Sequence, residues 1–208
     1  MPSIHKLLAD TLRTETVFEL GSRFGLDTIE LAKEMPWAEI HAFEANPERY
    51  DELHRRANKF NGQIKVVERA VWEEDGEVSF RINRTPNVGA SSVFADSGKY
   101  KYEQYRLDEP IKVPCTRLDT YIEQIGKAPG IIWSDLQGAD LAAMKSLGKY
   151  IDDVMVVYME INCIEMYEGI PTFVEIYEWM FEHNFRLHRY KSMWHGDFGE
   201  GLFIKMPS

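Results

Sequence analysis

Short apolar runs alternate with segments in which apolar residues recur at helical spacing along most of the chain. This alternation predicts an α/β fold with a mostly parallel sheet and helices on both of its faces. The run at 154–159 is the most apolar and is expected near the centre of the sheet. The expected strands are residues 16–20, 39–43, 64–67, 78–82, 130–134, 154–159, 185–190 and 202–205.

Prolines mark several boundaries of the expected helices. One helical segment runs through Ile29 and Met35 and stops at Pro36, and Pro47 opens a charged helix that reaches about Lys59. The last two strands are joined only by a turn-rich segment, which predicts antiparallel neighbours because a parallel pair needs a longer crossover. Further helices are expected within 1–15, over 118–125, through 141–147 and from 171 to 182.

The segment 84–109 differs from the rest because it has no steady period and is rich in Gly, Ser, Asn, Asp and Tyr. It predicts a long loop with one short helix, and loops of this length are commonly functional. We interpret it as a lid or insert at the active site. Its tyrosines, with Trp194, are suited to line a ligand site, although ordinary packing accounts for them equally well. The residues in question are Lys99, Tyr100, Lys101, Tyr102 and Tyr105.

Composition and charge narrow the class of protein. The chain has 208 residues, of which 44% are hydrophobic, so it is expected to fold as one domain over 1–208, with neither a repeat nor a linker. A net charge of −10 argues against binding to nucleic acid, because the surface would repel the phosphate backbone. No apolar stretch approaches the length of a membrane helix, and residues 1–6 lack the layout of a signal peptide. The chain has two cysteines, Cys115 and Cys163, which are too few for a disulfide scaffold. This low number favours a location in the reducing cytosol.

The turn after the first strand and the acidic residue after the second suggest a nucleoside site. Ligands bind at the carboxyl ends of strands in such sheets. Glu44 lies 19 residues beyond Gly25, at the end of the second strand, and nucleotide-binding sheets place at this position a carboxylate that accepts hydrogen bonds from ribose hydroxyls. A dinucleotide fingerprint needs glycine where this chain has Arg23. The acidic Glu19 suits a cofactor with an amino group, which points to S-adenosylmethionine. A purely structural strand–helix turn would also explain Gly21 and Gly25.

Four segments together resemble the FkbM-like family of S-adenosylmethionine-dependent methyltransferases. They are VFELGSRFG at 17–25, AFEANP at 42–47, NVGASSV at 87–93 and IWSDLQGAD at 132–140, and shorter matches lie at 117–119 and 158–162. The resemblance covers about 16–168, and the last of the four segments is the most specific. It implies a Rossmann-like class I methyltransferase fold, a mostly parallel seven-stranded sheet with an antiparallel last strand. It also implies O-methylation of a saccharide or small molecule.

The sequence departs from the family pattern at three positions. Glu19 and Asp140 each replace the commoner acidic residue, and Arg23 stands where Asn or Gly is more usual. Arg23 is placed to reach a cofactor carboxylate or an acidic substrate, so the substrate class stays open. The residues expected to bind the cofactor are Glu19, Gly21, Ser22, Arg23, Gly25, Asp27, Thr28, Glu44, Ala45, Asn46, Arg69, Ala70, Val71, Asp135 and Gln137.

Methyl transfer to a hydroxyl gains from a general base close to the methyl group. Asp135, at the end of the strand beside the cofactor strand, is the first choice, and capping of the next helix is its structural alternative. His195 in the closing loop is the competing base, and Glu160 and Asn162 flank the same mouth. Oxygen ligands from Asp135, Glu160 and Asn162 would suit magnesium, but no metal is expected.

Two other functions remain open from the sequence. A nicotinamide oxidoreductase would use the same fold but lacks its glycine at position 23. A non-catalytic accessory domain would keep the fold and lose the site. The presence of all four of the expected site residues Glu19, Gly21, Glu44 and Asp135 argues against this function. The sequence leaves the oligomeric state and the identity of the acceptor undetermined.

Overall fold

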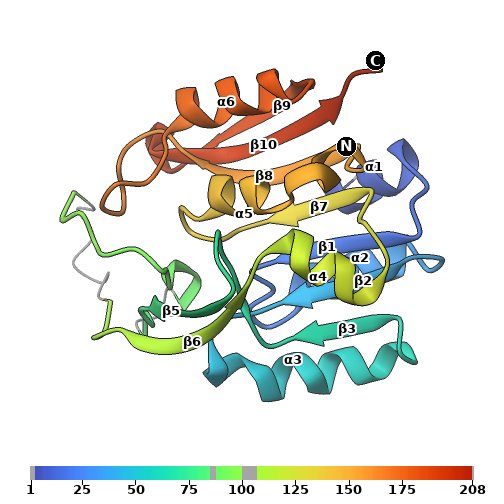
Figure 1. Cartoon of the computed structure of the whole chain (residues 1–208), viewed down its shortest axis with the longest axis horizontal. Coiled ribbons are helices and arrows are strands. Elements are labelled where there is room, and N and C mark those ends of the chain that lie inside the picture. The colour runs from blue at the N-terminus through green and yellow to red at the C-terminus, as the bar shows by residue number, and fades with distance from the viewer. Residues whose placement is uncertain (1–2, 85–87, 100–106, 208) are drawn as a thin grey trace.

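The computed structural model describes residues 3–84, 88–99 and 107–207, and its centre is a seven-stranded sheet (Figure 1). The strand order is β3-β2-β1-β7-β8-β10-β9, and every neighbouring pair is parallel except those that β10 makes with β8 and β9. This confirms the class I methyltransferase topology, including the antiparallel last strand. The strands are β1 Thr16–Leu20, β2 Glu39–Phe43, β3 Ile64–Val67, β7 Ile131–Ser134, β8 Val156–Asn162, β9 Phe185–Met193 and β10 Phe198–Lys205.

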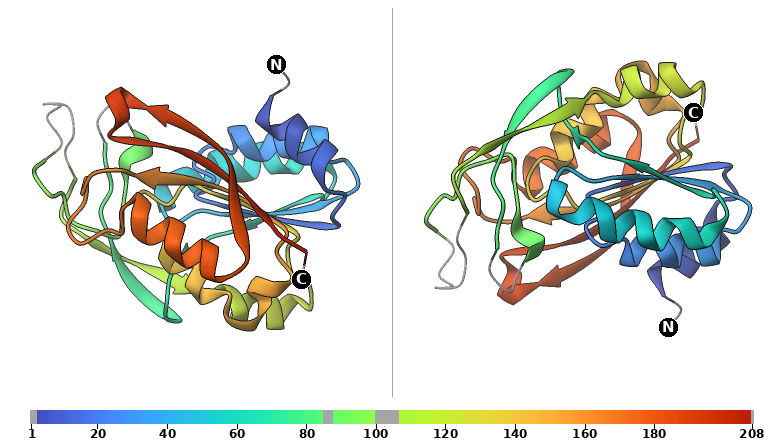
Figure 2. Two further views of the ribbon diagram at one scale, coloured as in Figure 1. Left: turned by 90° about the horizontal axis from the view of Figure 1, so that it is seen from above. Right: turned by 90° about the horizontal axis from the view of Figure 1, so that it is seen from below.

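Helices cover both faces of the sheet, as Figure 2 shows from above and below. The strands β1, β7 and most of β8 are buried on both sides, which is why they are continuous apolar runs. Successive side chains point to opposite faces, so Phe18 packs into one core layer and Val17 into the other. One layer is closed by α1 Ile4–Thr11, α2 Leu26–Glu34 and α3 Tyr50–Ala57, and the other by α4 Leu118–Ile125, α5 Asp140–Ser146 and α6 Phe173–Glu182.

Most predicted helix boundaries lie within a few residues of those in the structure. The helix at 118–125 is α4 as expected, and α2 ends just before Pro36. The charged helix after Pro47 is less regular than predicted, because 3₁₀ turns at Pro47–Arg49 and Asn58–Phe60 flank α3. The helix α6 begins with a cap in which the Glu175 carboxylate accepts from the Thr172 amide at 2.9 Å.

The strand predicted at 78–82 is present in the structure and begins two residues earlier. The observed strand β5, Gly76–Phe80, belongs to a separate three-stranded sheet of order β4-β6-β5, with β4 at Ala70–Val71 and β6 at Ile111–Thr116. The strand β6 was not predicted, because it contains Pro114, a residue that interrupts a strand pattern. This small sheet lies beside the carboxyl ends of β1 to β3, at the left of Figure 1.

The described part of the expected lid, 84–109, combines short bridges with one turn of 3₁₀ helix at Val88–Ala90. Arg81 pairs with Ser92 and Asp96 with Tyr167 in isolated bridges, which tie this segment to the rest of the chain. Lys99 forms an ion pair with Glu165. Tyr100, Lys101, Tyr102, Tyr105 and the side chain of Trp194 lie outside what the structure describes, so their expected contact with a ligand stays a prediction. In the described ranges, no helix is both long and apolar enough to cross a membrane.

Two leucines that each begin a helix test the contribution of the core. Leu118 opens α4 and is fully buried, whereas Leu26 opens α2 and is 62% exposed. We expect Leu118→Ala to lower the free energy of unfolding by about 2–5 kcal/mol, because it leaves a cavity in the core. Leu26→Ala is the matched control and should change it by less than about 0.5 kcal/mol. Chemical denaturation of both variants measures the difference, and equal effects would contradict the assignment of the core.

Candidate functional site

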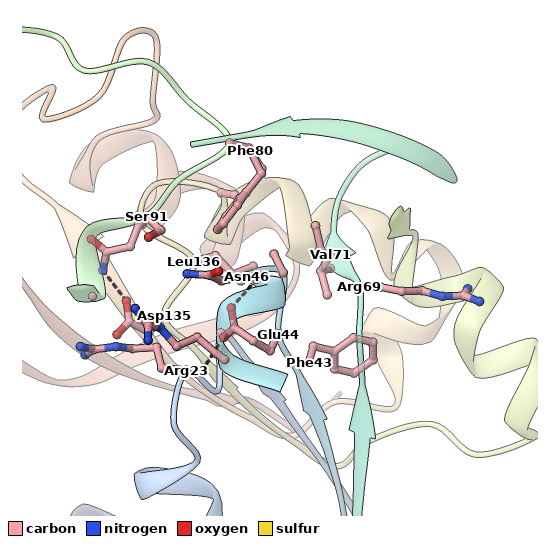
Figure 3. A pocket seen from close by; sticks show the side chains of 18 residues that line it. Arg23, Phe43, Glu44, Asn46, Arg69, Val71, Phe80, Ser91, Asp135 and Leu136 are labelled. Atoms are coloured by element: carbon pink, nitrogen blue, oxygen red, sulfur yellow. Dashed lines mark hydrogen bonds between the residues drawn. The ribbon is translucent and has the colours of Figure 1, made fainter. Parts of the chain in front are cut away.

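A pocket opens at the carboxyl ends of β1, β2 and β7, beside the small sheet, and we call it the inner pocket (Figure 3). It encloses about 590 Å³ including its opening to solvent. Segments from distant parts of the sequence form its walls. It is lined by Gly21, Arg23, Phe43, Glu44, Ala45, Asn46, Arg49, Arg69, Ala70, Val71, Phe80, Gly89, Ser91, Val93, Asp135, Leu136, Gln137 and Ala139.

Glu44 is held rigidly at the wall of the inner pocket. Its two carboxylate oxygens accept from the backbone amides of Arg23 and Asn46, each at 2.6 Å (Figure 3). Only 5% of the residue is exposed, and burial raises the pKa of its carboxyl, although the two amide bonds oppose that shift. The remaining lone pairs can accept from ligand hydroxyls without any rearrangement of the side chain.

Gly21 brings the turn after β1 into direct contact with the loop after β7. Its φ of +89° is a conformation that favours glycine, and a Cβ atom here would lie 2.1 Å from the carbonyl oxygen of Asp135. A larger residue is therefore excluded by the protein's own backbone as well as by the pocket. At Gly25 a Cβ atom would lie 2.6 Å from a Leu53 methyl carbon, so this glycine permits the packing of α3.

Glu19 lies behind the pocket wall rather than in it. The Ser22 hydroxyl donates to its carboxylate at 2.9 Å, and the Thr28 hydroxyl donates to the same oxygen. Glu19 is 2% exposed, and burial raises the pKa of its carboxyl to about 8. Glu19, Ser22, Gly25 and Thr28 thus shape the turn from within, and direct contact of these four residues with a cofactor stays a prediction.

Gln137 connects two carboxylates in the loop after β7. Its side-chain amide donates to Asp135 at 2.5 Å and lies 3.3 Å from both oxygens of Glu160. The Tyr167 hydroxyl donates to the Gln137 Oε1 atom at 2.7 Å, which fixes the amide with its nitrogen toward the acids. Gln137 has a φ of 51°, a strained conformation of the kind that functional sites retain.

The two acids linked by Gln137 both hold their protons more strongly than usual. Burial raises the pKa of Glu160 well above its usual range, and repulsion from Asp135 adds to that effect. Burial also raises the pKa of Asp135, which the positive charge of Arg23 partly offsets. Because two close carboxylates resist double ionisation, their proximity adds to the effect of burial on both pKa values.

Asp140 holds the same loop in place. The Ser134 hydroxyl donates to its carboxylate at 2.5 Å and the Leu136 amide donates at 3.2 Å, and burial raises the pKa of Asp140 to about 7. The alternative in which Asp135 caps the next helix is wrong, because α5 begins at Asp140 with Ala139 as its N-cap.

A second pocket, which we call the outer pocket, meets the inner pocket at Asp135. It lies on the α1 and α2 side of the sheet and has a volume of about 1050 Å³ including open solvent. Glu160 and Asp27, both expected from the sequence, line it. The full lining is Ile4, His5, Asp27, Trp133, Ser134, Asp135, Tyr158, Glu160, Arg189, Lys191, Phe198, Glu200 and Leu202.

Other expected site residues lie less centrally. His195 is exposed in the turn between β9 and β10 and lines neither pocket. Arg69 lines the inner pocket, but its guanidinium group points away from it in Figure 3. The side chain of Arg23 packs on Gly89, whose Cβ atom would lie 2.8 Å from the guanidinium carbon. Over the described residues, no group of three or more His, Cys, Asp or Glu side chains is arranged to hold a metal ion.

Sequence reasoning missed several residues that line the inner pocket. Arg49 stacks over the Phe24 ring at 4.6 Å, and Phe80 reaches the pocket from β5. Ser91 comes from the NVGASSV segment, which was singled out only for its family resemblance. That resemblance was a usable signal for Ser91, whereas Phe80 depends on a small sheet whose position the local sequence does not encode.

Comparisons with known proteins agree with this geometry. The sequence model of the "Methyltransferase FkbM domain" family matches residues 19–187. A curated relative, "2-O-methyltransferase NoeI" of Sinorhizobium fredii (strain NBRC 101917 / NGR234), is 22% identical over 177 residues, which are 80% of this chain and 72% of that protein.

Solved structures show the same fold. The methyltransferase FkbM of Methylobacillus flagellatus KT aligns with a TM-score of 0.59 at 13% identity over 94% of this chain, which spans only 45% of that longer chain. Magnesium protoporphyrin IX methyltransferase (ChlM) of Synechocystis PCC 6803, solved with bound SAM, aligns with a TM-score of 0.55 at 10% identity over 97% of this chain and 74% of that chain.

The buried acids of the site make the stability of the ligand-free protein depend on pH. The pKa of Glu19 is raised to about 8 and that of Asp140 to about 7, so the folded protein binds more protons than the unfolded chain between about pH 4 and pH 8. Stability should therefore fall as the pH rises through this window. We expect Tm to decrease from pH 5 to pH 8.5, and Glu19→Gln to flatten the decrease. Glu178→Gln, an exposed control on α6, should leave the slope unchanged; a Tm that rises over this window would contradict the electrostatics.

Proposed function

The chain belongs to the methyltransferase FkbM family of S-adenosylmethionine-dependent enzymes, and we propose that it methylates a hydroxyl oxygen of a saccharide or another small hydroxylated molecule. The observation that carries the proposal is the Asp135–Gln137–Glu160 group at the junction of the two pockets. A carboxylate with a raised pKa is suited to take a hydroxyl proton. The name of the relative NoeI, a 2-O-methyltransferase, also supports transfer to oxygen.

The residues of the inner pocket fit the adenosine part of the cofactor. The fixed Glu44 carboxylate offers acceptors for the ribose hydroxyls, and Val71 and Phe80 offer apolar surface for the base. Asp135 lies where this pocket meets the outer pocket. When bound, S-adenosylmethionine supplies a methyl group that is already activated for transfer.

The protein's own part in the reaction is therefore positioning and proton transfer. Asp135 is the better placed base, because it lines both pockets whereas Glu160 lines only the outer one. The Asp135 carboxylate accepts the acceptor's hydroxyl proton, and the Gln137 amide holds that carboxylate in place by a 2.5 Å hydrogen bond. Tyr167 and Ser92 in turn hold Gln137, through its side chain and its carbonyl oxygen respectively.

The alternative functions do not fit these residues. A nicotinamide oxidoreductase needs an open glycine at position 23 for the pyrophosphate, whereas Arg23 fills that position and packs on Gly89. A non-catalytic domain would have no reason to retain two buried, mutually repelling acids beside a pocket, or the strained backbone of Gln137 between them.

The proposal extends to the setting of the enzyme. Cys115 and Cys163 are both free thiols, which suits a reducing cytosol. The net charge of −10 favours a small-molecule acceptor over nucleic acid or an anionic membrane surface. Fractionation of the native host and a methyl-transfer screen against sugars, glycosides and small alcohols test these two statements.

Removal of the Glu44 carboxylate tests the cofactor site. Charge-assisted hydrogen bonds are worth about 1.5–3 kcal/mol each, so Glu44→Ala should weaken S-adenosylmethionine binding by at least about tenfold. Glu48→Ala removes a neighbouring carboxylate that lines neither pocket and should keep wild-type affinity. Isothermal titration calorimetry measures both; wild-type affinity in a folded Glu44→Ala protein would disprove the role of Glu44.

Two substitutions distinguish the candidate bases. Asp135→Asn keeps the size of the side chain but cannot take a proton, so kcat should fall by a factor of about 10²–10⁴ with little change in cofactor affinity. His195→Gln should be nearly silent, because His195 lines neither pocket. Rates are followed by release of S-adenosylhomocysteine across pH. Because protonation inactivates the base, the wild-type rate should fall as the pH drops through the raised pKa of Asp135. An inactive His195→Gln with an active Asp135→Asn would assign the base to the histidine.

A further inference from the structure

The outer pocket has a floor formed by one face of the sheet, and the strand register orders its charged side chains. Glu160 of β8 faces Glu200 of β10, which faces Lys191 of β9. Asp135 follows β7, the neighbour of β8 on its other side. Three carboxylates therefore lie in one row across the floor, with a lysine at the edge strand.

A second row of side chains on the same face of the sheet forms one wall of the outer pocket. Trp133, Tyr158 and Leu202 lie side by side on β7, β8 and β10, with Arg189 of β9 at the end of the row. The ring of His5 from α1 stacks on Trp133 at 4.6 Å, and its Nε2 atom lies 3.0 Å from the Asp27 carboxylate. The apolar row and α1 thus close the pocket on the side away from the strand ends.

Negative charge is left in excess on the floor. Lys191 lies 3.7 Å from Glu200 and offsets that carboxylate. In the part of the chain that the structure describes, Glu160 forms no ion pair, and its contacts within hydrogen-bond range come from Gln137 at 3.3 Å. Arg189 is exposed on the edge strand, where a basic residue also protects the edge from pairing.

Asn162 provides a second, independent indication of a ligand. It is 1% exposed, and its side-chain oxygen has no hydrogen-bond partner among the described residues. Two residues along β8 from Glu160, it projects from the same face of the sheet, opposite Phe198 of the pocket lining. A buried, unsatisfied acceptor is costly unless a ligand or water donates to it.

We propose that the outer pocket receives the acceptor and selects a neutral polyhydroxylated molecule, such as a glycoside, over its anionic counterpart. This inference rests on the proposed function and adds the charge class of the acceptor. The Asp135 and Glu200 carboxylates and the Asn162 side-chain oxygen accept hydrogen bonds, and a polyol supplies several hydroxyl donors. A carboxylate or phosphate on the acceptor would instead lie close to Asp135 and Glu200 and would further disfavour ionisation of Glu160, and like charges discriminate strongly in a partly desolvated site.

Matched acceptors test the charge selection. Methyl glycosides of glucose, galactose and mannose are compared with the corresponding methyl glycosiduronic acids by release of S-adenosylhomocysteine. We expect the neutral member of the best pair to have a kcat/KM at least about tenfold higher. Glu200→Gln removes one charge from the row and should narrow this gap by about threefold or more, while Glu178→Gln, exposed on α6, should leave the gap unchanged.

A second variant keeps the test valid if Glu200→Gln fails to fold. Asn162→Ala removes the unsatisfied oxygen and should raise KM for the neutral glycoside with a smaller change in kcat and none in cofactor affinity. Equal or better use of the uronic acids, or a gap that neither variant changes, would overturn the charge selection and leave O-methylation standing. Methylation at no hydroxyl of either series, with S-adenosylmethionine still bound in calorimetry, would overturn the saccharide acceptor itself.

Discussion

The close approach of the β1 turn to the loop after β7 is the constraint on which the site depends. Gly21 can lie against the Asp135 carbonyl only because it has no side chain. The amides of Gly21 and Ser22 both donate to the Phe43 carbonyl at 2.9 Å, and the Asp135 amide donates to the Leu20 carbonyl at 2.9 Å. The ends of β1, β2 and β7 are thereby joined through backbone groups, and their side chains are free to face the pockets.

This junction concentrates acidic groups in a small volume. Glu19, Glu44, Asp135, Asp140 and Glu160 all have raised pKa values, with burial as the largest cause in each case. Their roles nevertheless differ. Glu19 and Asp140 hold turns from within, Glu44 is fixed by two amides at the pocket wall, and Asp135 and Glu160 share the Gln137 amide at the junction. Position relative to the pockets, rather than residue type, separates the structural acids from those available for chemistry.

The sheet and most of the inner pocket could be predicted from the sequence, because they depend on local patterns. Strands such as 16–20 and 39–43 are apolar runs bounded by turns, and the residues that follow them must lie at one edge of a parallel sheet. The small sheet could not be predicted in this way. Its strand β4 has two residues, and β6 contains Pro114, so neither has a recognisable period. The place of Phe80 in the inner pocket therefore could not be predicted from the sequence.

The sequence alone determined the fold class, the family and the acidic residues at the strand ends, since periodicity and short motifs record local geometry. Only the tertiary structure decided what each acid does. In the structure, Glu19 lies behind the wall of the inner pocket, and Asp135 does not cap the helix that follows it. The side chain of Gln137 lies between Asp135 and Glu160. The tertiary structure also aligns Glu160, Glu200 and Lys191, which are far apart along the chain. Hydrogen-bond partners and burial arise from segments that meet only on folding, and for this reason no local pattern encodes them.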